Sequence, residues 1–137
     1  MNNAALKRNF FLWLLSFCSL MLLGSCGLKP ASLKFVFPDQ GAEVKGVLLV
    51  RVAVPVDYKS TLPRRGEVEF RFYIDDKLQE EAIVPESSDR VTWMWDTTEF
   101  PNGPHTITVV AVHYEVGRKG SPKKELQRLK RNVIVNN

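Results

Sequence analysis

Two histidines and a run of acids are the side chains from which a catalytic or metal site would be assembled in this chain. His105 and His113 are eight residues apart on one predicted strand, so they share a face at a distance of about 26 Å. That distance is too long for both rings to bind one metal ion. The acids between Asp75 and Glu81 fall on a predicted turn and a charged edge strand, which indicates a solvated edge. We therefore predict a protein that is not an enzyme and that has no metal or other cofactor.

The residue with the clearest chemistry is Cys26, which follows a leucine, a glycine and a serine. The chain begins with the positive charges of Lys7 and Arg8 and continues with a 14-residue apolar run from Phe10 to Leu23. This run is shorter than the roughly 20 residues that cross the core of a bilayer, and it has the length of the apolar part of a signal peptide. An uncleaved membrane anchor and an ordinary secretory cleavage site are the two alternatives.

This layout resembles the lipobox of bacterial lipoproteins. The resemblance implies that residues 1–25 are a cleaved signal peptide and that Cys26 becomes the N-terminus. It also implies a diacylglycerol on the Cys26 thiol and often an acyl chain such as palmitate on the new amine. Two or three chains anchor a protein stably, whereas one chain binds only marginally. Gly27 stands where an Asp favours inner-membrane retention in many Gram-negative bacteria, so we expect the bacterial cell envelope, with the outer membrane favoured in a Gram-negative cell.

Composition sets limits on the part that would remain. Removal of residues 1–25 leaves 112 of the 137 residues, with 17 basic against 15 acidic side chains. This small excess of positive charge gives no reason to expect nucleic-acid binding. No cysteine follows Cys26, so the domain has no disulfide and must be stabilised by its hydrophobic core.

Short segments with period-2 hydrophobicity recur from residue 33 onward. The clearest is Glu67 to Ile74, where four apolar side chains alternate with three charged residues and a tyrosine. In a second segment the even positions from Leu48 to Val54 are apolar, and Arg51 marks the wetter face. The seven predicted strands cover residues 33–37, 47–54, 67–74, 77–84, 91–95, 105–114 and 126–135. Turn residues separate them, so the sequence predicts an all-β fold, an immunoglobulin-like β-sandwich of about seven strands.

Particular motifs agree with this fold class. Residues 38–46, 72–78 and 95–109 resemble the opening Pro-x-x-Gly segment, the Phe-Tyr-Val-Asp hairpin and the Trp-Asp-Thr-Thr…Pro-Asn-Gly-x-His segment of bacterial Ig-like domains. The resemblance implies a tether at residues 26–32 and one Ig-like domain at residues 33–137, a non-catalytic module of surface and secreted proteins. His113 and Tyr114 stand where many members have an Asp and a Gly-rich turn, which puts a calcium role in doubt.

Candidate binding residues fall into two groups. Tyr58, Arg64 and Arg65 lie in the long loop between the second and third predicted strands, where Tyr58 is expected to be a surface aromatic. The C-terminal block is basic, and its candidates for contact with acidic envelope polymers or anionic headgroups are Lys123, Lys124, Arg128 and Lys130. This block could also pair with the acidic residues 75–99. We predict that Trp93 and Trp95 pack in the core rather than form a platform for sugars.

These observations favour a lipid-anchored interaction module of the cell envelope, without catalysis. Its expected partners are the membrane, through the lipid on Cys26, and an envelope protein or an acidic polymer. The first alternative is a carbohydrate-binding module for envelope polysaccharide. A more remote alternative is the accessory domain of a hydrolase.

Overall fold

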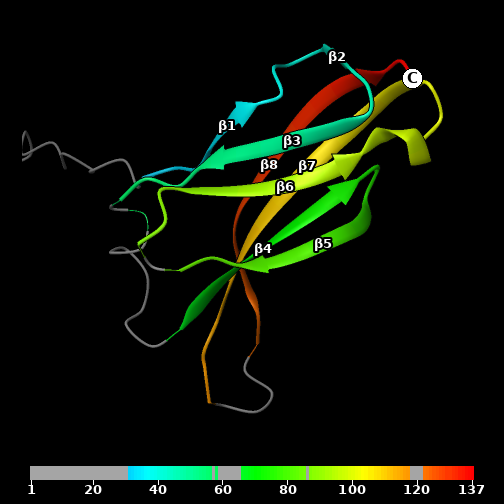
Figure 1. Ribbon diagram of the computed structural model, residues 1–137. Coiled ribbons are helices and arrows are strands. Elements are labelled where there is room, and N and C mark those ends of the chain that lie inside the picture. The colour runs from blue at the N-terminus through cyan, green and yellow to red at the C-terminus, as the bar shows by residue number, and fades with distance from the viewer. Residues whose placement is uncertain (1–30, 57, 59–65, 86, 118–121) are drawn as a thin grey trace, which may run out of the picture.

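The computed structural model describes residues 31–56, 58, 66–85, 87–117 and 122–137, which form an all-β sandwich of two layers (Figure 1). The predicted fold class is confirmed. The small sheet has the strand order β1-β3-β6 and the large sheet the order β2-β8-β7-β4-β5. The small sheet contains β1 (Lys34–Phe37), β3 (Val47–Ala53) and β6 (Arg90–Asp96). The large sheet contains β2 (Ala42–Val44), β4 (Glu67–Ile74), β5 (Lys77–Ile83), β7 (Gly103–Tyr114) and β8 (Lys124–Val135).

The structure has eight strands in its described part, one more than the seven predicted. The additional strand is β2, which runs parallel to β8 with Ala42 opposite Val133. Three residues are too few to show a period-2 pattern, so this strand has no clear signal in the sequence. The other seven strands correspond to the seven predicted segments, with ends that differ by a few residues.

The core lies between the sheets and follows the predicted alternation. Phe70, Phe72 and Ile74 of β4 point inward against Val50 and Val52 of β3, and all five side chains are at most 1% exposed. Residues with the opposite parity on β4 face outward. Burial of side chains of this size contributes about 1.5–3 kcal/mol each, which lets the domain fold without a disulfide.

Two predictions about strand position are confirmed by the topology. The strand with apolar residues on both faces, β7, lies between β8 and β4 and is therefore central. The charged strand β5 lies at an edge of the large sheet. The tight turn between β4 and β5 is formed by Asp75 and Asp76 with φ angles of 48° and 66°, a left-handed conformation that Asp adopts more readily than most residues.

Candidate functional site

Tyr58 is not the surface aromatic that the sequence predicted. Its side chain is 5% exposed and belongs to the hydrophobic core cluster with Leu33 and Val54. Burial raises the pKa of Tyr58 to about 12, because the charged phenolate is disfavoured away from water. The prediction failed because a loop position was taken as evidence of exposure, whereas this tyrosine folds back against the sandwich.

Three other predicted residues, Cys26, Arg64 and Arg65, lie outside the described residues. The same is true of the whole predicted signal peptide, residues 1–25. No helix in the described part of the chain is long and apolar enough to cross a membrane.

The predicted basic residues lie on or next to β8, and two of them are tied to acids on the outer face of the large sheet. Lys123 Nζ lies 3.0 Å from Glu69 Oε2, and the Arg71 Nε lies 2.6 Å from Glu69 Oε1. Arg128 forms an ion pair of 2.8 Å with Glu125, three residues earlier on the same strand. Most of the charge in this part of the large sheet is therefore neutralised locally.

Glu69 is the centre of this ion-pair network and is only 7% exposed. Burial favours its neutral form, but hydrogen bonds from Lys123 and Arg71 outweigh burial and hold the pKa of Glu69 below its usual value. Arg71 also contacts Glu81 of β5 at 3.0 Å. The network joins β4, β5 and the start of β8, so its role is to hold strands together.

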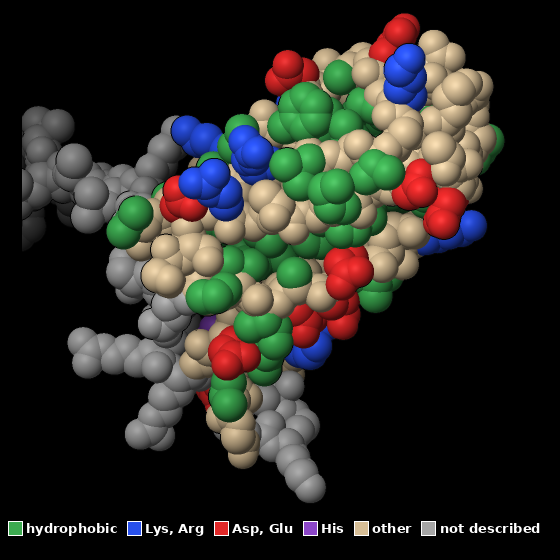
Figure 2. Space-filling model, in the orientation of Figure 1, with side chains coloured by type: hydrophobic (Ala, Val, Ile, Leu, Met, Phe, Trp, Pro, Cys, Tyr) green, Lys and Arg blue, Asp and Glu red, His purple; other side chains and the backbone are tan. Residues whose placement is uncertain are grey.

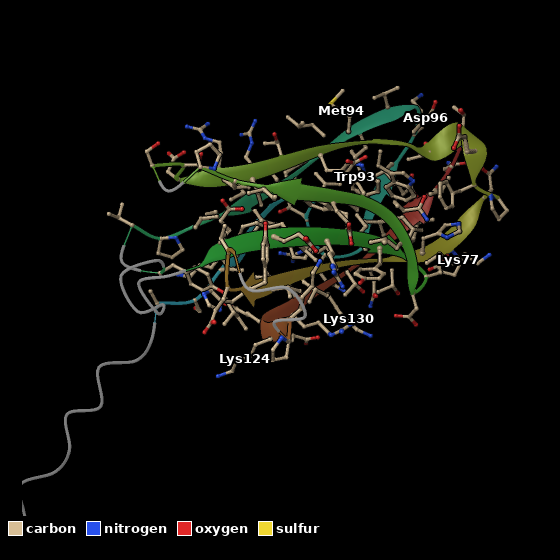
Figure 3. The ribbon with its side chains drawn as sticks, turned by 90° about the horizontal axis from the view of Figure 1, so that it is seen from below. Lys77, Trp93, Met94, Asp96, Lys124 and Lys130 are labelled. Atoms are coloured by element: carbon tan, nitrogen blue, oxygen red, sulfur yellow. The ribbon has the colours of Figure 1, made fainter. Side chains whose placement is uncertain are left out.

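Lys124 and Lys130 form no ion pair with another residue in the described ranges, and both are exposed. Figure 3 shows both side chains on β8, on the opposite side of the sandwich from Met94 of β6. Of the four predicted basic candidates, these two remain available to an external anion. A pairing between the acidic residues 75–99 and the basic C-terminal block, one of the alternatives that the sequence allowed, is not among the ion pairs of the described residues.

The outer face of the small sheet carries an apolar strip that the sequence reading missed. The strip, a name used below for these four residues only, consists of Phe37, Val47, Leu49 and Met94. Leu49 lies directly opposite Met94, and Phe37 and Val47 are each one diagonal step away. Val47 and Met94 are 61% and 60% exposed. Figure 2 shows apolar side chains gathered over β1, β3 and β6, with Lys and Arg side chains toward the end where β1 begins.

A signal for the apolar strip is present in the sequence. Arg51 was taken to mark the wet face of the second predicted strand, yet Val47 and Leu49 have the same parity as Arg51 and are apolar. A strand with only one charged residue on its outer face is a sign that this face meets something other than water.

The two edges of the small sheet, β1 and β6, contact the large sheet through different kinds of side chain. At the β1 edge, the side chain of Gln127 accepts a hydrogen bond from the Leu33 N–H at 2.9 Å and donates to the Leu33 carbonyl at 3.3 Å. The guanidinium of Arg131 stacks 5.0 Å from the Phe35 ring centroid. Both long side chains reach from β8 of the large sheet and close this side of the sandwich.

At the β6 edge, aromatic rings take the place of these polar bridges. Trp93 stacks on Phe72 of β4 with ring centroids 5.3 Å apart. Trp95 is 2% exposed and is part of the core, as predicted, whereas Trp93 is only partly buried and packs against it. The stacking holds Trp93 in place and leaves part of its ring accessible beside β6.

His105 is held in a structural role. Its Nδ1 lies 2.6 Å from Asp75 Oδ2 and its Nε2 lies 2.8 Å from the Pro101 carbonyl oxygen. The Pro101 carbonyl and the ionised Asp75 carboxylate both accept hydrogen bonds, so this arrangement favours the doubly protonated ring, in which both nitrogens donate. Burial lowers the pKa of His105, but the bonds to the Pro101 carbonyl and to Asp75 outweigh it and raise the pKa overall. This ties the β4–β5 turn to the start of β7.

The described residues form no cluster of metal-ligating side chains. They contain no group of three or more His, Cys, Asp or Glu side chains placed to share a metal ion. A depression of about 220 Å³ opens to solvent at the end of β2. It is lined by Glu43, Val44, Lys45 and Asn136.

Comparisons with known proteins support the fold and leave the family open. No protein-family description matches this chain, and no curated protein matches it. An endo-β-1,4-mannanase structure from Thermotoga petrophila is similar over 89% of this chain, with 22% identity and a TM-score of 0.52. The chain covers 23% of the mannanase, and at this identity the likeness concerns the fold alone. A lytic polysaccharide monooxygenase from Jonesia denitrificans has 12% identity and a TM-score of 0.41 over 82% of this chain and 84% of its own.

Proposed function

We propose that this chain is a non-catalytic interaction module of the bacterial cell envelope, anchored by lipid on Cys26, that contacts a partner protein through the small sheet. The observation that carries the proposal is the apolar strip. Its four residues are contiguous across three strands and three of them are 44–61% exposed. Contiguous exposed apolar surface of this kind is typical of a protein interaction site.

The outer face of the large sheet differs from that of the small sheet, and the difference favours the small sheet as the binding surface. The large sheet's outer face carries four ion pairs between described residues that are satisfied within the domain. Exposed pairs of this type contribute little to recognition, because each charge is already compensated and screened. The small sheet has uncompensated apolar area, and the basic residues Lys34 and Arg51 lie toward one end of its strands, beside Arg90, which is ion-paired with Asp89. A partner with an apolar centre and an acidic rim would be complementary to this face.

The position of β1 fits an anchor at Cys26. The described chain enters the small sheet at Leu33 and β1 begins at Lys34. The six residues between Cys26 and Leu33 span about 20 Å at full extension. The end of the sandwich where β1 begins would therefore lie close to the membrane. The small sheet would then be presented to other proteins at the surface of the same membrane.

Labelling tests the anchor. Cells that express the chain are fed an alkyne fatty-acid analogue, and the purified protein is examined for the label. We expect label on the wild type and none on Cys26→Ala. Absence of label on the wild type, or its retention in the variant, would contradict the lipid anchor while leaving the surface proposal open.

Site-specific photo-crosslinking in cells tests the surface. A photoreactive amino acid is placed either at Val47, in the strip, or at Lys130, on the outer face of the large sheet. Both positions are exposed, so they form a matched pair. The proposal predicts discrete protein adducts from Val47 and none from Lys130. Adducts from Lys130 alone would place the partner on the large sheet.

A second candidate is an acidic envelope polysaccharide bound through Lys124 and Lys130. The observation that favours it is that both lysines are exposed and free of ion pairs with other described residues. Charge reversal at these two positions should abolish retention on cell-wall preparations if this candidate is right. Reversal at Lys123 or Arg128 is a poor test, because it would also break the pairs with Glu69 or Glu125.

A further inference from the structure

Among the described strands, the small sheet leaves one strand position vacant. Phe72 of β4 stacks on Trp93 of β6, and Gln127 of β8 bonds to Leu33 just before β1. The small sheet therefore covers the large sheet from β8 to β4. Strand β5 lies beyond β4, and no described strand of the small sheet lies over it (Figure 1). An added strand beside β6 would fill this position and cover the inner side of β5.

The backbone of β6 is arranged to accept such a strand. One more backbone hydrogen bond lies beyond each end of the β3–β6 ladder. The Val54 N–H donates to the Asp89 carbonyl, and the Thr97 N–H donates to the Gly46 carbonyl. In an antiparallel pair, hydrogen-bonded residues alternate with residues whose backbone groups face the other way. The odd-numbered residues of β6 are therefore bonded to β3. The N–H and C=O groups of Thr92 and Met94 point to the vacant side.

This edge lacks the usual protection against strand addition. Such protection consists of short length, bulges, proline or charge along the strand. Strand β6 has seven residues in unbroken register with β3. It contains no proline, and its charged residues are at the two ends, Arg90 and Asp96. The five residues between them are uncharged.

The chemistry around the vacant position indicates what kind of strand it would take. Glu80 of β5 lies opposite the inward-facing Phe72, so by strand alternation it faces the same side as Phe72, the residue on which Trp93 stacks. Glu80 forms no ion pair with another described residue. Ala82, opposite Phe70, faces the same side and is small. A carboxylate and a partly buried tryptophan that flank the same phenylalanine are suited to a Lys or Arg side chain between them.

A second copy of this chain does not fit the vacant position. Antiparallel pairing of two β6 strands would bring the two small sheets side by side and the two large sheets side by side. Neighbouring strands are about 4.8 Å apart, so each β5 would occupy the space beneath the other copy's β6. The occupant must be a strand without a second layer attached to it, such as an extended segment of a partner protein.

We infer that the edge of β6 binds an extended segment of the partner protein by strand addition, with an inward-facing Lys or Arg next to Glu80 and Trp93. The apolar strip lies on the outer side of the same strand through Met94, so one partner would contact both. The inference rests on the proposed function, since it names how the small sheet would engage its partner.

The test uses the purified full chain in detergent and a capped heptapeptide, Thr-Val-Thr-Lys-Thr-Val-Thr, as the probe. Tryptophan fluorescence gives the affinity, and site-resolved hydrogen exchange gives the position. We expect Thr92 and Met94 amides to become protected. Thr92→Pro removes an outward N–H and leaves the β3 ladder intact, so affinity should fall by at least about tenfold. Thr92→Ala keeps the N–H and should bind within about twofold of the wild type.

Charge exchange tests the predicted chemistry. The same peptide with Glu in place of Lys should bind the wild type more weakly, and Glu80→Lys should reverse this preference. No change of protection at Thr92 and Met94 with millimolar peptide would overturn the inference. So would equal affinity for Thr92→Pro, or perturbation of Trp93 by envelope polysaccharide but not by peptide.

The two proposals fail in different ways. Absence of protein adducts from a photoreactive residue at Val47 in cells would contradict the proposed function. A Val47 adduct that is unchanged by Thr92→Pro would keep the interaction surface and overturn strand addition at β6.

Discussion

The two edges of the small sheet differ in how they meet the rest of the molecule. Strand β1 has four residues, a bulge between Phe35 and Phe37, and polar bridges from β8. Strand β6 has seven residues in regular register, and its edge is bordered by the partly exposed ring of Trp93. One edge is closed against pairing with other chains. The β1 edge shows that this fold can close an edge of the small sheet. The open edge of β6 therefore indicates a place where another strand can bind.

The largest expected effect tests which side of β6 is paired. Val91 is bonded to β3 and is 3% exposed, whereas Thr92 is exposed and its N–H faces outward. Val91→Pro should lower the free energy of unfolding by about 3–5 kcal/mol, through a lost ladder bond and lost apolar burial. Thr92→Pro should cost about 1 kcal/mol or less. Urea unfolding of both variants measures the difference, and equal losses would contradict the assignment of the open side.

A smaller effect tests the closed edge. Gln127→Ala removes both hydrogen bonds to Leu33, whose side chain is 2% exposed. The expected loss is about 1–2 kcal/mol, because a buried backbone N–H and C=O lose their partner. Gln79→Ala is the control, since Gln79 is exposed on β5 and, among the described residues, its side chain bonds only to the Lys77 carbonyl two residues away. If Gln127→Ala were as mild as this control, the bridges would not be what closes the β1 edge.

The hydrogen bonds of His105 to Asp75 and Pro101 lie at neither edge of the small sheet. They give the stability of the domain a pH dependence of their own, which serves as a reference. The pKa of His105 is raised above its ordinary value of 6.5 in the folded chain. Its contribution to stability is therefore complete below that value and is lost as the pH rises through the folded pKa. The melting temperature should fall as the pH is raised through the folded pKa of His105, and it should fall less in Asp75→Asn. An identical pH profile in the two proteins would contradict a charged His105–Asp75 pair.

The contribution of Asp75 to stability has the opposite pH dependence to that of His105. Burial raises its pKa, but hydrogen bonds from the Thr106 N–H and from His105 outweigh burial and hold the pKa below its ordinary value of 3.8. Its contribution is present above that value and is lost as the pH falls through the folded pKa. The His105–Asp75 pair should stabilise the folded chain most between the folded pKa of Asp75 and the folded pKa of His105.

The smallest expected effect concerns the large sheet. Lys123→Ala removes one cation from Glu69 and leaves Arg71 in place. Since Lys123 is exposed, the loss should be below about 1 kcal/mol. Chemical denaturation of this variant should give a midpoint close to that of Lys130→Ala, which breaks no ion pair with a described residue. A large difference would mean that the ion-pair network, rather than the core, dominates the stability of this sheet.

The fold could be predicted from the sequence because burial in a sandwich repeats every second residue. The alternation from Val68 to Ile74 located β4 to the residue, and the turn at Asp75 and Asp76 was correct. The three residues of β2 were too short to give such a pattern. Burial of Tyr58 was missed because it depends on how a loop folds back, which period-2 reasoning does not address.

The candidate site was harder to predict than the fold. The basic residues are conspicuous in the sequence, but two of the four are neutralised. Lys123 pairs with Glu69, far away along the chain, and Arg128 pairs with Glu125, three residues earlier. The open edge of β6 depends on which strands become neighbours, and pairing order is not encoded in any single segment. The apolar strip could have been found, since Val47 and Leu49 interrupt the expected wet face.

The most direct test of the central claim is site-resolved hydrogen exchange on β6 in the unliganded chain. An open edge predicts that the amides of Val91 and Trp93, bonded to β3, are protected. It predicts that the amides of Thr92 and Met94 exchange at rates close to those of exposed loops. Uniform protection along β6 would mean that another part of the chain or a second copy already covers the edge, and it would contradict the account.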